Sequence, residues 1–254
     1  MTLGPAERAV LLAFADDEHL MGQRHTEWIG VAPFLEEDLA FSSIAQDELG
    51  HAVALYELVG DPVDGGDVDG GDVDVDAFAF GRGRDDWRSC WLVEEPCTDW
   101  ADALVRHWLY DTAEWSRWEA LAGSTDSGIR AVAARALQEE RYHRQHADAL
   151  LDALADDPEA TVRIGAALDR LLPLAVGMFA AGTEAHGADR DVVGPPLDDL
   201  RTAWCAEVDR RFGPRRWTAV EAPDGHDRTR RGPHFDEMYA RMREVFALDP
   251  TAHW

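Results

Sequence analysis

The feature that most constrains this chain is the helical period of its apolar residues, which persists through most of its length. Apolar side chains recur every three or four positions along four long stretches, at residues 5–28, 35–59, 99–121 and 127–154. Pro5 suits a first helical turn, and Gly60-Asp61-Pro62 stops the second stretch. We therefore expect four long helices.

Further helices are expected after the fourth stretch. The pattern predicts a fifth helix over 159–181, in which Pro173 introduces a kink, and shorter helices over 197–212 and 234–247. Strand patterns are nearly absent. The sequence therefore predicts an all-α fold, a single domain over residues 1–254 built on a four-helix bundle with additional C-terminal helices.

The charge of the chain excludes one class of partner. The formal net charge is −26, and all 24 basic residues are arginine because the chain contains no lysine. Such a surface repels phosphate, so we expect no binding of nucleic acid. An acidic, lysine-free surface is typical of proteins from a salt-rich (halophilic-type) cytoplasm, where salt screens the self-repulsion.

Targeting and cysteine patterns indicate a cytoplasmic protein. No apolar run approaches the roughly 20 residues that span a bilayer, and the N-terminus lacks a basic segment followed by an apolar one, so no membrane association is expected. The three cysteines, Cys90, Cys97 and Cys205, include no pair at C-x-x-C spacing. We expect free, partly buried thiols.

A low-complexity stretch, "DPVDGGDVDGGDVDVDAF", begins at residue 61. It has the composition of glycine–aspartate calcium repeats, but one imperfect copy cannot stack into a solenoid. We interpret about 60–84 as an acidic, solvated loop.

Two motifs with the spacing E-x-x-H suggest metal binding. Glu48 and His51 lie three apart on the second predicted helix, and Glu140 and His143 repeat the spacing on the fourth. Residues three apart share a helix face. Two such motifs, with one inward Glu on each of the other two helices, form the ligand set of a di-iron carboxylate bundle.

The remaining two ligands are expected on the first and third helices. Glu27 in "RHTEWIG" and Glu114 in "HWLYDTAEWSRW" are the candidates, with Asp111 as a rival of Glu114 and Glu139 as a rival of Glu140. Glu27 does not match the level of Glu48 in a simple hairpin unless the first helix kinks or extends. The predicted metal ligands are Glu27, Glu48, His51, Glu114, Glu140 and His143.

The chemistry of this set fits two iron ions. Four carboxylates neutralise and bridge the metals, and two imidazoles complete an open coordination sphere that can take O₂. The alternative is that these acids are solvated surface residues. The mostly apolar neighbours of Glu48 and Glu114 argue against it, because a carboxylate buried without a cation costs several kcal/mol.

Four segments carry a family resemblance. The segments "GQRHTEWIGVAPFLEEDLAFSSIAQDELGHA", "WLVEEPCTDWADALVRHWLYDTAEW", "ALQEERYHRQHADALL" and "LRTAWCAEVDRRF" together resemble PaaC-type subunits of ring-1,2-phenylacetyl-CoA epoxidase. The resemblance covers nearly the whole chain, including the closing "HFDEMYARMREVFALDPTAHW", whereas 61–76 looks like an insertion.

The resemblance implies a ferritin-like fold and a role in aerobic phenylacetate catabolism, in a monooxygenase complex that epoxidises the ring of phenylacetyl-CoA. In that complex the PaaA-type paralogue carries the di-iron site and catalyses the reaction, PaaC is its structural partner, and a flavin/iron–sulfur reductase delivers electrons from NADPH. The other epoxidase subunits and the reductase are therefore expected partners, and phenylacetyl-CoA is met through the complex. The resemblance leaves open whether this chain is itself an enzyme.

One departure from the family pattern bears on the cofactor. PaaC-type subunits typically lack part of the ligand set, whereas this chain resembles the catalytic paralogue at all six predicted positions. The cofactor is therefore either di-iron or none in this subunit. Two other functions compete with a structural subunit: an autonomous di-iron oxygenase acting on a CoA thioester, and a non-redox, metal-binding ferritin-like protein.

Two further features suggest contact surfaces. The tryptophans at 100, 108, 115 and 118 would lie round several faces of the third helix, as expected where a helix meets another subunit, unless all four fill this chain's own core. Arginines cluster in "RRFGPRRW" and "DRTRRG". They suit a partner's acidic surface or the phosphates of CoA, and the alternative is pairing with this chain's own acids.

Overall fold

The computed structural model describes residues 3–60, 73–215, 220 and 228–250, and every regular element in these residues is helical. The predicted all-α fold is confirmed. The acidic loop expected over about 60–84 lies partly outside the described residues, at 61–72. Its last part is not a loop, because it forms helix α3 (Val75–Gly81), whose first turn is capped by Asp74, and a short 3₁₀ turn over Arg84–Asp86.

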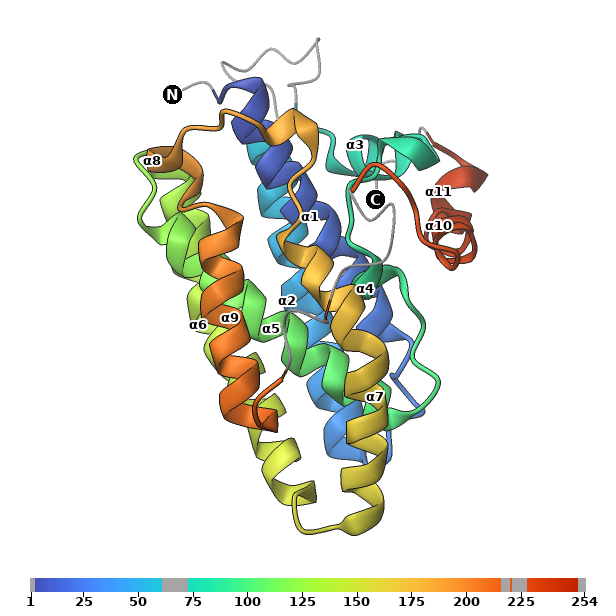
Figure 1. Ribbon diagram of the computed structural model, residues 1–254. Coiled ribbons are helices and arrows are strands. Elements are labelled where there is room, and N and C mark those ends of the chain that lie inside the picture. Colours follow the sequence, from blue (N-terminus) through green and yellow to red (C-terminus); the bar gives the residue numbers. More distant parts are fainter. Residues whose placement is uncertain (1–2, 61–72, 216–219, 221–227, 251–254) are drawn as a thin grey trace.

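Two antiparallel hairpins form the bundle (Figure 1). The first pairs α1 (Pro5–Thr26) with α2 (Leu35–Val59), and the second pairs α5 (Trp100–Ala122) with α6 (Ser127–Leu154). Helices α2 and α6 are neighbours, which closes the bundle on one side. These four helices begin and end within two residues of the sequence prediction.

Side-chain caps fix where several helices begin. Asp99 accepts a hydrogen bond from the Asp102 amide at the start of α5, and Asp126 accepts from the Gly128 and Ile129 amides at the start of α6. These bonds satisfy backbone donors that have no partner within the helix.

The fifth helix, α7 (Pro158–Val176), is shorter than predicted. The helix was expected to reach residue 181, but it ends at Val176, and from its C-cap Gly177 the chain tightens into a 3₁₀ turn at Gly177–Phe179. Pro173 lies inside the helix. Helices α7 and α9 (Leu197–Phe212) pack on α5. The helix expected over 234–247 is divided into α10 (Phe235–Met242) and α11 (Glu244–Leu248). The remaining short elements are α4 (Trp91–Glu94), the 3₁₀ turn Thr183–Ala185 and α8 (Arg190–Val193).

The tryptophans of α5 all contact side chains of this chain or lie in its core. Trp108 and Trp118 are buried in the core of this chain. Trp100 packs against the Phe41 ring, and Trp115 lies under the Arg144 guanidinium. Because α5 is the central helix, its aromatic residues meet several neighbours within the same chain. The alternative that the tryptophans fill this chain's own core therefore holds for Trp108 and Trp118, whereas Trp100 and Trp115 are partly buried.

Three consecutive acids of α1 are fully buried and point to three different partners. Asp16 accepts from the Tyr56 hydroxyl and pairs with Arg82. Asp17 lies between two buried arginines, Arg117 at 3.0 Å and Arg228 at 2.8 Å. The third, Glu18, faces the interior of the bundle. Helix α1 is therefore held by buried charge as well as by apolar packing.

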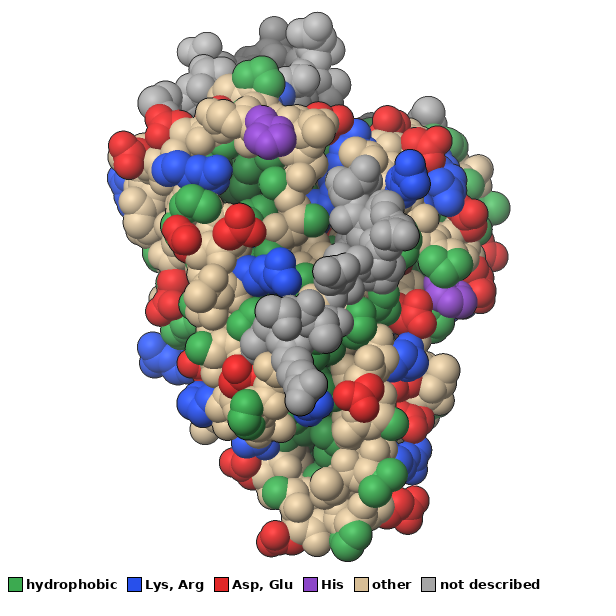
Figure 2. Space-filling model, in the orientation of Figure 1, with side chains coloured by type: hydrophobic (Ala, Val, Ile, Leu, Met, Phe, Trp, Pro, Cys, Tyr) green, Lys and Arg blue, Asp and Glu red, His purple; other side chains and the backbone are tan. Residues whose placement is uncertain are grey.

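The arginines of the C-terminal part mostly bind acids of this chain. Arg211 pairs with Asp152 and Arg215 with Asp169, while Arg228 and Arg231 are buried against Asp17 and Glu94. Arg216, which belongs to the same cluster in the sequence, lies outside the described residues. Arginine and acidic side chains are interspersed over the face shown in Figure 2. Pairing with this chain's own acids, the alternative to a partner's surface or CoA, is therefore what the structure shows for Arg211, Arg215, Arg228 and Arg231.

One segment meets the length and composition of a membrane span. Residues 158–185 are apolar enough, but half of this stretch is buried in the fold. The core helix of a soluble protein passes the same test, so this segment is weak evidence for a membrane.

The Asp17 ion pairs predict a large loss of stability on substitution. Replacing Asp17 by Ala leaves Arg117 and Arg228 buried without their counter-charge, which should lower the free energy of unfolding by about 3–5 kcal/mol. The matched control is Glu57→Ala, which removes an exposed acid and should change stability by less than about 0.5 kcal/mol. Denaturant unfolding of both variants measures the difference, and equal effects would contradict the role given to Asp17.

Candidate metal centre

Helix α1 contributes Glu18 to the interior of the bundle. Its carboxylate is fully buried and accepts a hydrogen bond of 2.6 Å from the Tyr110 hydroxyl. The other carboxylate oxygen lies 3.2 Å from Nδ1 of His51. The tyrosine on α5 thereby fixes the direction of a side chain from α1.

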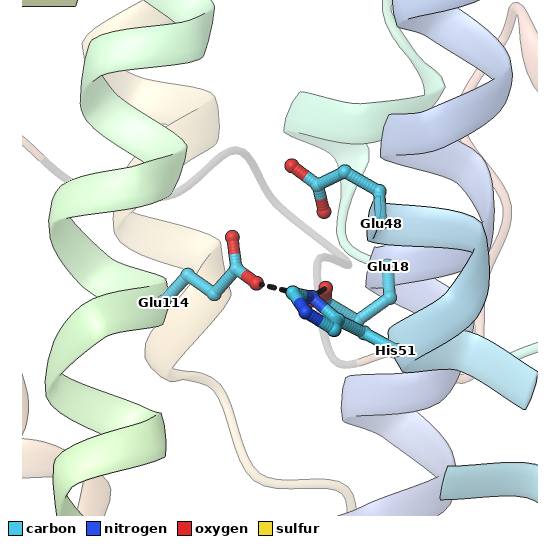
Figure 3. Close-up of side chains that lie close together, drawn as sticks. All are labelled: Glu18, Glu48, His51 and Glu114. Atoms are coloured by element: carbon cyan, nitrogen blue, oxygen red, sulfur yellow. Dashed lines mark hydrogen bonds and ion pairs between the residues drawn. The ribbon is translucent and has the colours of Figure 1, made fainter. Parts of the chain in front are cut away.

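Helix α2 contributes the first E-x-x-H pair. Nδ1 of His51 lies 3.2 Å from Glu18 and 3.3 Å from Glu114 of α5, as Figure 3 shows. Glu48, one turn earlier, is buried and points into the same space. The candidate ligand atoms of Glu18, Glu48, His51 and Glu114 all lie within 4.8 Å of one another.

Helix α6 contributes the second pair. Glu140 and His143 are both fully buried, and Nδ1 of His143 lies 2.9 Å from Glu140. Glu140 also lies 3.8 Å from Nδ1 of His51. The predicted residues Glu48, His51, Glu114, Glu140 and His143 therefore all lie in the interior of the bundle.

The prediction that Glu27 lies with these residues is wrong. Glu27 follows the last residue of α1, and its partly exposed carboxylate pairs with Arg24 and Arg241. Glu48 lies thirteen residues into α2, about 20 Å of helical rise from the hairpin turn. Glu18, eight residues before the end of α1, is far closer to that level and supplies the carboxylate from this helix. The level mismatch in the sequence was the signal that pointed away from Glu27.

The two rival acids have other contacts. Asp111 is buried, but it lies 2.8 Å from Nδ1 of His107 on the same helix. Glu139 lies 2.8 Å from Nε2 of His51, on the side of the imidazole away from the interior cluster. Glu139 therefore does not take the position of Glu140. Asp111 lies beside the cluster, since both of its oxygens lack a hydrogen bond and its like charge helps to raise the pKa of Glu140.

A layer of histidines lies beside the cluster. Nε2 of His107 is 3.3 Å from Nδ1 of His146, whose other nitrogen lies 3.0 Å from Glu37 of α2. Burial lowers the pKa of His107 to about 3 and that of His146 to about 4, so both imidazoles are neutral at pH 7. This layer was not singled out from the sequence, where its members occur far apart.

Buried acids in the cluster favour the protonated form when no cation is present. Burial raises the pKa of Glu18 to about 8, and Glu114 contributes to this rise by like-charge repulsion. The pKa values of Glu48 and Glu140 are raised in the same way. Glu114 is the exception. Burial opposes its ionisation, but hydrogen bonds from His51 and Glu18 outweigh burial and lower its pKa to about 2.

The donor set fits a pair of cations. Both oxygens of Glu48 and one oxygen of Glu114 are buried without a hydrogen-bond partner. Glu140 and Nδ1 of His143 form a buried ion pair at 2.9 Å but make no hydrogen bond. Buried polar atoms are rarely left unpaired, and a metal ion would satisfy all of them.

The outer nitrogens of both imidazoles also fit metal binding. Nε2 of His51 meets Glu139, and Nε2 of His143 lies 3.2 Å from Asp47. Metal-ligating histidines almost always donate their second N–H to a carboxylate or carbonyl, which orients the ring and leaves the other nitrogen for the metal. The arrangement suits first-row divalent metals with carboxylate and imidazole ligands.

The chain matches known proteins over nearly its whole length. A family model described as "Phenylacetic acid catabolic protein" matches residues 5–254. The chain is 28% identical over 253 residues to the PaaC-type subunit of the 1,2-phenylacetyl-CoA epoxidase of Escherichia coli (strain K12), an alignment that covers 97% of this chain and 98% of the relative.

The raised pKa of Glu18 predicts a pH-dependent stability of the metal-free protein. Between its unfolded value of 4.5 and about 8, Glu18 of the folded protein holds a proton that the unfolded chain has lost, so its contribution to the free energy of unfolding falls as pH rises. The buried neutral histidines act in the opposite sense below about pH 6.5, so the fall in stability is expected from pH 7 to 8. Each such proton contributes about 1.4 kcal/mol per pH unit. Urea unfolding of metal-free protein from pH 5 to 9 measures the slope.

Two variants locate the source of this slope. Glu18→Gln should flatten the fall in stability, whereas Glu57→Gln, at an exposed site on α2, should leave it unchanged. A wild-type stability that is constant or rises from pH 7 to 8, or a slope there that Glu18→Gln leaves unchanged, would contradict the assignment.

Proposed function

Because the chain belongs to the phenylacetic acid catabolic protein family, we propose that it is a subunit of a multicomponent 1,2-phenylacetyl-CoA epoxidase. In this complex it serves mainly as the structural partner of the catalytic di-iron subunit. The observation that carries the proposal is the extent of the match, since the family model covers residues 5–254 and the PaaC-type relative from E. coli aligns over nearly the full length of both chains. An end-to-end match means that the whole fold, and not one motif, is shared.

The proposal places this chain in the cytoplasm with defined partners. These are the catalytic PaaA-like subunit, the remaining epoxidase subunits and the reductase that supplies electrons. Phenylacetyl-CoA would be bound by the complex. The net charge of −26 supports the expectation that no nucleic acid is involved.

We further propose that the interior cluster binds two metal ions, with iron as the metal expected from the ligand set. Such a pair, when bound, supplies Lewis acidity and the capacity to reduce O₂. The residues that would hold it are Glu18, Glu48, His51, Glu114, Glu140 and His143.

The chain's own side chains prepare this cluster for cations. Glu139 and Asp47 accept from the outer nitrogens of the two imidazoles and so hold both rings in orientation. Tyr110 holds Glu18, and the Trp118 indole donates to Glu114 at 2.8 Å. Cations would displace the protons that burial keeps on Glu18 and its neighbours, so metal binding should release protons.

One observation favours a second candidate, an autonomous di-iron oxygenase acting on a CoA thioester. The complete set of six buried carboxylate and imidazole ligands exceeds what a purely structural subunit requires. The third candidate, a non-redox metal-binding protein, has no comparable support. Activity of the chain without the catalytic subunit separates the first two functions.

If this chain is a structural subunit, the epoxidase activity should require both this chain and the catalytic subunit. Phenylacetyl-CoA-dependent NADPH oxidation, measured with the reductase and remaining subunits present, should be at least tenfold higher with this chain and the catalytic subunit together than with either alone. A structural partner raises activity only by ordering the other chain. Full activity from this chain alone would favour the autonomous oxygenase, and full activity from the catalytic subunit alone would remove the need for this chain.

The ligand set predicts which substitutions remove metal. Protein loaded with Fe(II) under anaerobic conditions should contain about two iron ions per chain. His51→Ala and Glu18→Ala should each reduce the iron content by at least half, because each removes a ligand from the interior. The matched control is Glu27→Ala, which removes the surface glutamate of the same hairpin and should retain the wild-type content.

The metal content of these variants decides the proposal. Equal iron in wild type and His51→Ala would rule out the interior site. Loss of iron in Glu27→Ala with none in Glu18→Ala would reverse the assignment on α1. Circular dichroism of each variant tests whether the fold is kept.

A further inference from the structure

The exposed apolar side chains of this protein are concentrated on one face. Among the described residues, ten large hydrophobic side chains are exposed, and seven of them lie on the α1–α2 turn, on α2 and on α6. We call this surface the α2–α6 face. It is defined by Ile29, Val31, Phe34, Leu35, Leu39, Val53 and Tyr142.

The residues of this face lie on one side of α2 and on the neighbouring part of α6, with the polar Ser43 and Gln46 between Leu39 and Val53. Leu35, Leu39 and Val53 follow the helical period along the outer side of α2, and Leu35 and Leu39 are 69% and 64% exposed. Tyr142 of α6 stacks on His146, which hydrogen-bonds to Glu37 of α2. The face therefore extends across both helices and onto the hairpin turn.

The α2–α6 face is also unusually poor in acidic residues. The chain contains 50 Asp and Glu, yet none of the exposed residues of α6 from 127 to 149 is acidic. On α2, the exposed positions between Glu36 and Glu57 are Leu39, Ser43, Gln46 and Val53, all uncharged. The acids that border the face are Glu36, which is exposed, and Asp38, Asp47 and Glu139, which are partly buried. An apolar surface with so few exposed acids, on a chain of net charge −26, is expected where another protein excludes water.

Charge indicates that the partner is a different chain. The charged side chains exposed on α6 from 127 to 149 are Arg130, Arg135 and Arg141, and Arg141 has no carboxylate within ion-pair distance among the described residues. In a symmetric dimer through this face the arginines of α6 would have to find carboxylates on the same face of the copy, and the exposed residues of α6 from 127 to 149 include none. A head-to-tail contact between copies would leave one face free and continue into a filament. The face suits a different polypeptide that presents apolar side chains and carboxylates.

The face lies directly over the candidate metal centre. Glu139 and Asp47, which hold the outer nitrogens of His51 and His143, are 24% and 29% exposed. A protein bound on the face would cover these two carboxylates and remove the water beside them. Glu139 and Asp47 thus connect the interaction surface with the histidines of the interior cluster.

We infer that the α2–α6 face is where this chain binds the catalytic subunit of its complex, through Leu35, Leu39 and Tyr142 with Arg141 facing an acid of the partner. This inference rests on the proposed function and adds the surface that performs it. Apolar and aromatic side chains at the centre of an interface carry most of its binding energy, so few substitutions should suffice to break it.

The experiment measures the dissociation constant between purified full-length chains, with the catalytic subunit immobilised. Leu35→Glu combined with Leu39→Glu should weaken binding at least tenfold, because it places two carboxylates in an apolar contact. Both side chains are exposed, so thermal unfolding of the isolated chain should be unchanged. The matched control is Val162→Glu combined with Leu248→Glu, which makes the same charge change at residues that are 72% and 83% exposed elsewhere, and binding should be retained.

Each outcome decides between explanations. Wild-type binding that the Leu35/Leu39 variant keeps would overturn the face and leave the proposed function standing. Equal weakening by both double variants would show a general charge effect and overturn the face as well. No binding by wild-type protein would contradict the proposed function and the inference with it. A dimer of the isolated chain that the Leu35/Leu39 variant dissociates would show that a second copy occupies the face.

Discussion

The placement of α1 depends on three buried carboxylates at consecutive positions. Successive residues on a helix are about 100° apart, so the side chains of Asp16, Asp17 and Glu18 point in different directions. Each must be compensated from a different direction, and the rest of the chain supplies the partners. The pair formed by Asp17 and Arg228 is the most far-reaching, because it joins α1 to a segment more than 200 positions later. The guanidinium also donates to the carbonyls of Ala180 and Arg88, which ties two connecting segments to the same point.

The buried acids of the interior cluster lack the cationic partners that Asp17 has. Asp17 has cationic partners that lower its pKa, whereas Glu48 and Glu140 have no hydrogen-bond donor and burial raises theirs. Burying acids in this way costs free energy unless a cation or a proton compensates. The outer carboxylates Glu139 and Asp47 orient the imidazoles toward the same space. A structural subunit that keeps this arrangement retains the means to bind metal, and its stability and metal content are then linked.

The position of the cluster relative to the surface connects this chemistry with assembly. The acid-poor face of α2 and α6 consists of the outer sides of the two helices that carry the E-x-x-H pairs. One side of each helix therefore faces the interior ligands and the opposite side faces solvent or a partner. A partner bound on the outer side would touch Glu139, which in turn contacts Nε2 of the His51 ring.

The sequence by itself determined the helices and the two E-x-x-H pairs, because both depend on local spacing. Helical period and stop signals fixed the bounds of the four long helices, and a spacing of three puts Glu48 with His51, and Glu140 with His143, on one helix side. What only the tertiary structure decided depends on how helices are aligned along their axes. Glu18 and Glu27 both lie in α1 or at its end, and nothing local distinguishes them. The level at which α1 packs against α2 puts Glu18 beside His51 and leaves Glu27 with surface arginines. That level is set by contacts between residues far apart in the chain, which no local pattern contains.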